Sequence, residues 1–178
     1  QNEAAAARRG YSGTPLVEGD HLICQVGGVP GTGVVCFDKL SGKVVWKSQD
    51  DLASFASPLI MTLAGKRQFV TLATEKILSV DTENGELLWS QPVPTLYFRN
   101  VVTPIAAGNS VIAASHSEGM LCMSGTGSNG KANRKWNAPK LKINLATPVV
   151  VDGSLYSFAE KDRFICVDTA TGKVNWEE

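Results

Sequence analysis

The sequence has no long hydrophobic run and no excess of charge of either sign. No apolar stretch approaches the ~18 residues of a membrane-spanning helix, so we predict no membrane span. Lys and Arg together number 17, as do Asp and Glu, and the formal net charge is zero. Because a neutral chain has no net attraction for nucleic acid or for an anionic membrane surface, we predict neither as a partner.

Signatures of several enzyme classes are also missing. The chain has no Gly-x-Ser-x-Gly elbow of serine hydrolases and no His-Glu-x-x-His motif of zinc proteases. His21 and His116 lie far apart in the sequence and no Cys-x-x-Cys pair occurs, so zinc-ligand spacing is absent. Residues 125–130 match Gly-x-Gly-x-x-Gly by letter, but the residues after them favour a strand over the helix of a dinucleotide site. We predict no catalytic residue and no metal site.

The first eleven residues carry neither an initiator Met nor an apolar core of signal-peptide length. We expect residues 1–11 to be a leader or linker, at the start of a fragment of a longer protein. The native compartment cannot be predicted from this segment.

The chain does contain an internal repeat, marked by its four tryptophans. Three of them end the same motif, Asp-x-x-[Ser/Asn/Thr]-Gly-[Lys/Glu]-x-x-Trp, at residues 38–46, 81–89 and 168–176. A Thr-Pro or Ser-Pro pair stands earlier in each unit, at 14–15, 57–58, 103–104 and 147–148. A fixed period of this kind indicates four copies of one structural unit.

The pattern within each unit predicts four short strands. In the last unit we expect strands near 148–151, 154–159, 163–167 and 173–176, separated by turn residues. Segments 112–114 and 149–151 are apolar on both faces, so they need cover on both sides. Stacked four-stranded antiparallel blades supply that cover. We predict an all-β fold, a partial β-propeller over residues 12–178 with blades at about 12–50, 51–94, 95–139 and 140–178.

The repeated motif also predicts which residues anchor the blades. An Asp can accept backbone N–H groups across a tight turn, and a Gly can take the positive φ that closes the hairpin. A Trp at the end of the outer strand offers a large apolar surface to the neighbouring blade. The predicted structural anchors are Trp46, Trp89, Trp136, Trp176, Asp38, Asp81, Asp168, Gly42, Gly85 and Gly172.

The third unit departs from the pattern. Ser124 stands where the other units have the turn Asp, and the segment 125–135 is longer than its equivalents. We expect that loop to bulge from the rim of the propeller.

The combined motifs resemble the pyrroloquinoline-quinone-like, or quinoprotein-like, repeat family over about residues 12–178. WD-type repeats are disfavoured because no Trp here is followed by Asp, and kelch repeats favour double glycines. The resemblance implies a ring of seven or eight blades, of which four are present here. A ring of four blades and the pairing of two half-rings remain alternatives, since each would cover the open blade faces.

Four cysteines are present, at Cys24, Cys36, Cys122 and Cys166. The last three occupy one aligned position, where the second unit has Ser79. We favour buried free thiols at this position, which accepts small residues. The alternative is a cross-strand disulfide between Cys24 and Cys36, which face each other if their hairpin is symmetric about Pro30.

Propellers bind ligands on the loop face around the axis. Here that face is formed by the loops that enter each innermost strand and by those between the second and third strands. A protein or peptide partner, or a small ligand, is expected there. Any single residue of these loops is more readily a solvated side chain, and Arg99 with Asn100 is the favoured pair because both directly precede an inner strand. The candidate binding residues are Phe55, Arg99, Asn100, His116 and Asn144.

Three functions follow from the resemblance. The first is a non-catalytic binding or scaffold domain, as in a subunit of the outer-membrane protein assembly machinery, with no cofactor. The second is a fragment of an alcohol dehydrogenase that depends on pyrroloquinoline quinone and calcium, although no Cys-Cys pair typical of many such enzymes occurs. The third is a sensor propeller fused to another domain. The resemblance implies a periplasmic or secreted protein.

Overall fold

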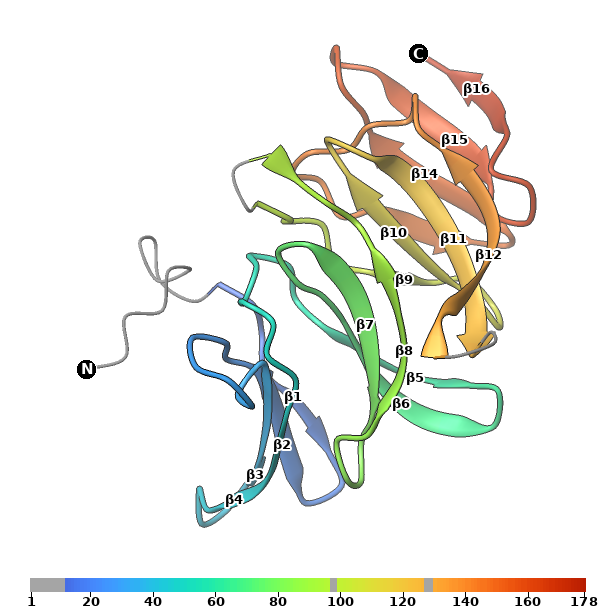
Figure 1. The fold of residues 1–178 in the computed structure, drawn as a ribbon. Helices are drawn as coiled ribbons and strands as arrows, with labels where there is room; N and C mark the ends of the chain where they lie inside the picture. The colour runs from blue at the N-terminus through green and yellow to red at the C-terminus, as the bar shows by residue number, and fades with distance from the viewer. Residues whose placement is uncertain (1–11, 97–98, 127–129) are drawn as a thin grey trace.

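The computed structural model describes residues 12–96, 99–126 and 130–178, which form four separate four-stranded sheets (Figure 1). In each sheet the strands pair antiparallel, in chain order. The first two sheets contain β1 (Leu16–Glu18), β2 (His21–Gln25), β3 (Val34–Asp38), β4 (Val44–Ser48), β5 (Leu59–Leu63), β6 (Lys66–Leu72), β7 (Lys76–Asp81) and β8 (Leu87–Pro92). The other two contain β9 (Ile105–Ala106), β10 (Val111–Ser115), β11 (Gly119–Thr126), β12 (Ala132–Ala138), β13 (Val149–Val151), β14 (Ser154–Phe158), β15 (Phe164–Asp168) and β16 (Val174–Glu177).

The sheets are the blades of a β-propeller, which confirms the predicted fold class. They follow one another along an arc, with β1–β4 at one end and β13–β16 at the other (Figure 1). The first strands β1, β5, β9 and β13 are neighbours along the inner side of this arc. Within the described residues, no helix is long and apolar enough to cross a membrane.

The Asp-to-Gly turn has the same geometry wherever the motif is complete. In the first blade Asp38 N donates to Lys43 O at 2.8 Å, and Gly42 N donates to Asp38 O at 2.9 Å. The Asp38 carboxylate also accepts from Ser41 N and Ser41 Oγ, both at 2.7 Å. The same backbone bonds recur at residues 81–86 and 168–173. The motif therefore specifies the hairpin into each outer strand through local hydrogen bonds alone.

Cross-strand register gives each blade two different faces. In the first blade, one row of residues stands opposite one another across the four strands and ends at the tryptophan. It contains Leu16, Ile23, Cys36 and Trp46. We call the face that carries this row the tryptophan face. The adjacent row points to the opposite face, because side chains alternate along a strand. It contains Val17, Leu22, Phe37 and Val44, and we call its face the receiving face.

The tryptophan face of each blade packs on the receiving face of the next. This arrangement builds three hydrophobic clusters, one at each junction between blades. Their buried members include Ile23 and Cys36 with Phe69 and Val80, then Val70 and Trp89 with Val111 and Met123, then Ile112 and Cys122 with Leu155 and Val167. The core of the molecule therefore lies between the blades.

Two of the junctions show why the motif pairs a Gly with a Trp. A Cβ placed on Gly85 would lie 2.5 Å from Cε3 of Trp46, and one on Gly172 would lie 2.6 Å from Cε3 of Trp136. Both glycines also have positive φ, 75° and 72°. At these two junctions the tryptophan of one blade thus lies directly on the turn glycine of the next.

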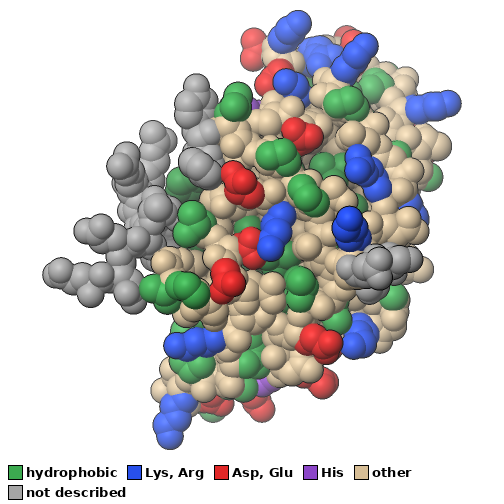
Figure 2. Space-filling model, in the orientation of Figure 1, with side chains coloured by type: hydrophobic (Ala, Val, Ile, Leu, Met, Phe, Trp, Pro, Cys, Tyr) green, Lys and Arg blue, Asp and Glu red, His purple; other side chains and the backbone are tan. Residues whose placement is uncertain are grey.

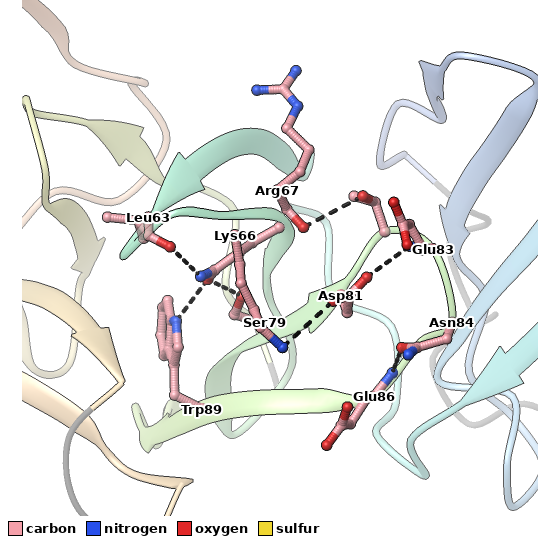
Figure 3. A network of polar contacts seen from close by, with 11 residues as sticks. Leu63, Lys66, Arg67, Ser79, Asp81, Glu83, Asn84, Glu86 and Trp89 are labelled. Atoms are coloured by element: carbon pink, nitrogen blue, oxygen red, sulfur yellow. Dashed lines mark hydrogen bonds and ion pairs between the residues drawn. The ribbon is translucent and has the colours of Figure 1, made fainter.

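The middle junction is built differently, because the third blade lacks the standard turn. Trp89 Nε1 donates to Gln68 Oε1 at 2.9 Å, and Ser79 Oγ donates to the same oxygen at 2.7 Å (Figure 3). Gln68 Nε2 donates to Leu63 O at 2.9 Å. Gln68 is buried, so the second blade supplies its own partner for the indole N–H.

The long hairpin of the third blade reaches back to the second. Lys131 forms a parallel β-bridge with Ser90 on β8, and Gly125 lies near Ala64. Of the segment 125–135 predicted to bulge, residues 132–135 belong instead to β12 and Lys131 is held against β8, while residues 127–129 lie outside the described residues.

The alternative of a Cys24–Cys36 disulfide is wrong. Cys36 stands opposite Ile23 and Cys24 opposite Val35, so the two side chains point to opposite faces of the sheet. A hairpin symmetric about Pro30 would place Cys24 opposite Cys36. The observed pairing of β2 with β3 is shifted from that register by one residue. All four cysteines are free; Cys24 is half-buried and the others are buried. Burial and the nearby Cys24 raise the pKa of Cys36 to about 11, so this thiol stays protonated at neutral pH.

Candidate functional site

The up-and-down path of each blade brings two sets of loops to one end of the sheets. The segments that enter each first strand meet the loops between second and third strands. Three backbone hydrogen bonds join them: Thr74 N to Leu52 O at 3.3 Å, Val93 N to Glu75 O at 2.9 Å and Glu160 N to Lys142 O at 3.1 Å. We call the surface formed by these loops the axis face.

Arg99 and Asn144 are brought together across the junction between the third and fourth blades. Arg99 Nη2 donates to Asn144 Oδ1 at 3.2 Å. Arg99 is half-buried and Asn144 is exposed, so the pair forms part of the accessible surface. The sequence predicted both residues for one site, and they are direct neighbours in space.

Asn100 has a structural role that the sequence analysis did not assign. Its side chain is buried, and Nδ2 donates to Ala73 O at 2.8 Å and to Thr74 O and Val93 O at 3.3 Å each. These bonds hold the entry segment of the third blade on the second blade. Since its donors are already engaged within the protein, binding of a ligand by Asn100 stays a prediction.

Phe55 and His116 lie on the same face but in separate contacts. Phe55 N donates to Asn100 O at 2.9 Å, which links the entry segments of two blades. His116 Nε2 lies 3.3 Å from Ser117 Oγ, and that hydroxyl accepts from Leu96 N at 3.2 Å. Among the described residues no hydrogen bond joins His116 to Arg99, Asn144 or Phe55. The predicted residues therefore occupy one face without forming one tight cluster.

A second polar group on this face was missed by the sequence analysis. Asp51 pairs with Lys76, Oδ1 to Nζ at 3.1 Å, and Gln25 Oε1 accepts from Ser54 N at 3.3 Å. Asp51 Oδ2 and Gln25 Nε2 are buried without a partner in the described part of the chain. A polar residue at the end of an apolar strand, such as Gln25, was the available signal.

Arg99 differs from two other arginines of the chain in its partner. Arg163, in the loop between β14 and β15, pairs with Glu177 at 2.7 Å, and Arg67, at the opposite end of the sheets, pairs with Glu18 at 2.6 Å. Arg99 has only the neutral amide of Asn144, and no described carboxylate lies within salt-bridge distance of it. Elsewhere charges of both signs are interspersed over the side seen in Figure 2. Arg99 is thus a cation suited to carbonyl or carboxylate acceptors of a ligand.

Over residues 12–96, 99–126 and 130–178, no three His, Cys, Asp or Glu side chains come together in a way that could hold a metal ion.

Comparison with known proteins places this arrangement in a family. Residues 4–178 match the family model described as outer membrane protein assembly factor BamB. No curated protein matched the chain.

Solved structures show the same fold. BamB from Moraxella catarrhalis is 20% identical with a TM-score of 0.68, and the match covers 92% of this chain and 47% of that one. The computationally designed Ika8 protein is 14% identical with a TM-score of 0.58, covering 92% and 48%. A quinohemoprotein alcohol dehydrogenase from Pseudomonas putida HK5 is 12% identical with a TM-score of 0.58, covering 92% and 34%. The chain spans less than half the length of each.

Proposed function

Since the chain belongs to the family of the outer membrane protein assembly factor BamB, we propose that it is a non-catalytic scaffold that binds an extended peptide segment of a protein partner. Family analogy supports a role in cell-envelope protein assembly, in the periplasm or in another exported location. The surface proposed to bind is the axis face, where loops from neighbouring blades meet. An extended peptide presents a row of carbonyl acceptors, and one with acidic side chains adds carboxylates.

The position and contacts of Arg99 are the main support for this proposal. It is a half-buried cation at a blade junction, oriented by Asn144 at 3.2 Å and without a described carboxylate partner. A guanidinium held in this way is ready to donate to a carbonyl or carboxylate, and little side-chain entropy remains to be lost on binding.

The test is direct binding of immobilised extended peptides, in acidic, neutral and basic versions of one sequence. We expect the acidic peptide to bind most tightly, and Arg99→Ala to weaken that binding about tenfold or more. Arg134→Ala is the matched control, because it removes the same charge from an exposed position on the outer strand β12. Equal affinities of the two variants, or no preference for the acidic peptide, would exclude Arg99 from the site.

The second candidate is a dehydrogenase dependent on pyrroloquinoline quinone and calcium, favoured only by the shared fold with the quinohemoprotein dehydrogenase. A titration of the chain with the quinone and calcium, followed by absorbance and thermal unfolding, separates the two proposals. Calcium-dependent binding with a higher Tm would support the dehydrogenase. The third candidate, a sensor propeller, requires a further domain in the same polypeptide.

A further inference from the structure

The third blade carries a long stretch of one charge sign. Residues 119–151 contain no Asp or Glu, and their cations are Lys131, Arg134, Lys135, Lys140 and Lys142. The whole chain has as many acidic as basic residues, so its other residues carry a matching acidic excess. The sequence analysis judged an anionic surface from the net charge alone, and a net charge of zero conceals this segregation.

These cations follow the outer edge of the blade. Arg134 and Lys135 lie in β12, which is the edge strand of its sheet, and Lys131 directly precedes it (Figure 1). Lys140 and Lys142 follow β12 and lead to the axis face, where Lys142 O accepts from Glu160 N. Lys142 is half-buried and the other four are exposed. We call the surface formed by these five cations the basic band.

The charge of the basic band is not compensated within the molecule. The salt bridges of the described residues involve other cations, namely Lys39, Lys66, Arg67, Lys76 and Arg163. The second and fourth blades flank the third on either side (Figure 1), so the exposure of the band does not arise at an end of the blade arc. The band therefore presents several unpaired cations to whatever lies beside the rim.

Protection of a sheet edge does not account for the band. Charged side chains on an edge strand discourage pairing with other strands. The other outer strands have much less charge, because β4 has only Lys47, β16 has only Glu177 and β8 has no charged residue. Lys140 and Lys142 also lie beyond the end of β12. The third blade thus differs from blades that face the same edge problem.

We propose that the basic band docks the chain on the surface of an anionic lipid bilayer. A strand rises about 3.3 Å per residue, so the stretch from Lys131 to the end of β12 extends over about 20 Å. A flat anionic surface can contact such a row of cations at several points at once. A single small anion would instead need cations that converge on one point.

The structure favours a bilayer over nucleic acid. Single-stranded nucleic acid needs exposed aromatic side chains on which its bases stack. Trp136, the aromatic residue of β12, is half-buried, and its Nε1 donates to Thr169 O at 2.9 Å in the next blade. The band is also separate from the proposed peptide site, since Arg134 and Lys135 lie on an outer strand and Arg99 precedes an inner one. The docking proposal therefore does not rest on peptide binding.

Co-sedimentation of the chain with vesicles tests the proposal. We expect binding to phosphatidylcholine vesicles that contain phosphatidylglycerol and none to pure phosphatidylcholine, with weaker binding as added salt screens the charges. Each cation near an anionic bilayer contributes about fivefold in affinity. The double variant Arg134→Gln, Lys135→Gln should therefore bind roughly twentyfold more weakly.

The double variant Lys43→Gln, Lys173→Gln is the matched control. Both lysines are exposed, follow the turn glycine of their blade and form no salt bridge within the described residues. The control has the same net charge as the band variant, but its cations belong to the first and fourth blades. Its affinity for the anionic vesicles should fall by less than about twofold. Circular dichroism of both variants establishes that they remain folded.

Three outcomes would overturn the proposal. Equal losses in the two variants would mean that net charge, and not the basic band, drives binding. Equal binding to neutral and anionic vesicles would remove the electrostatic basis. Absence of vesicle binding, with binding of soluble polyglutamate by the unmodified chain, would assign the band to an acidic protein partner instead.

Discussion

The middle and end blades share one repeat pattern but differ in how much of it is buried. Trp89, in the second blade, has no exposed surface, while Trp176 at the same position of the fourth blade is 42% exposed. Of the large hydrophobic side chains exposed in the described residues, only Leu87 and Leu96 belong to the middle blades. The difference shows that a blade's core residues are buried by its neighbours, as in other repeat proteins whose stability depends on the contacts between adjacent units.

The largest expected effect separates the two tryptophans. Trp89→Ala should lower the free energy of unfolding by about 3–5 kcal/mol, because it opens a cavity at the middle junction. Trp176→Ala should cost only about 1 kcal/mol, since it removes ring contacts with Tyr156 and Phe164 on an open face. Urea unfolding of both variants measures the difference. Equal losses would mean that the fourth blade is buried as deeply as the second.

The turn glycines sharpen the same comparison. Gly85→Ala forces a Cβ against the ring of Trp46 as well as an unfavourable positive φ, and should cost about 2–4 kcal/mol. Gly42→Ala introduces only the unfavourable positive φ and should lower the free energy of unfolding by about 1–2 kcal/mol. Thermal unfolding at low protein concentration reports the gap between them. Equal destabilisation by the two substitutions would show that the Trp46 ring moves aside at no cost in stability.

The smallest expected effect concerns acid stability of the end blades. Hydrogen bonds from Ser41 and Thr171 hold the pKa of Asp38 and Asp168 below the usual range. A carboxyl with a depressed folded-state pKa stabilises the fold above its unfolded value, and this contribution is lost as the pH falls from about 4 through the folded-state pKa. The double variant Asp38→Asn, Asp168→Asn should therefore lose less stability on acidification than the unmodified chain. If the double variant and the unmodified chain lost the same stability on acidification, this account of the turns would be contradicted.

The sequence predicted the four blades well because their signals are local. The Asp-to-Gly turn depends on hydrogen bonds within six residues, so the motif at 38–46 identifies a hairpin without knowledge of the fold. The tryptophan period then locates the outer strand of every blade. Arg99 and Asn144 were both predicted for the loop face, because each precedes an innermost strand, but their direct contact was not predicted.

Other features depended on contacts that no motif encodes. Asn100 was predicted to bind a ligand, but its donors reach three carbonyls of the second blade. No sequence motif singled out Gln68. Its side chain accepts a hydrogen bond from Trp89 Nε1, because the third blade lacks the standard turn. The positions of Cys24 and Cys36 on opposite faces followed from a register shift of one residue, which exchanges the two faces of a strand.

By itself the sequence determined the strands and the Asp-to-Gly turns, because these follow from backbone preferences and hydrogen bonds between residues close in the chain. Only the tertiary structure decided which of four equivalent tryptophans is buried and which acceptors bind the indole N–H groups of Trp89 and Trp136. Burial and partner choice depend on the surface that the neighbouring blade presents, and the described residues contain three such junctions, each with its own contacts.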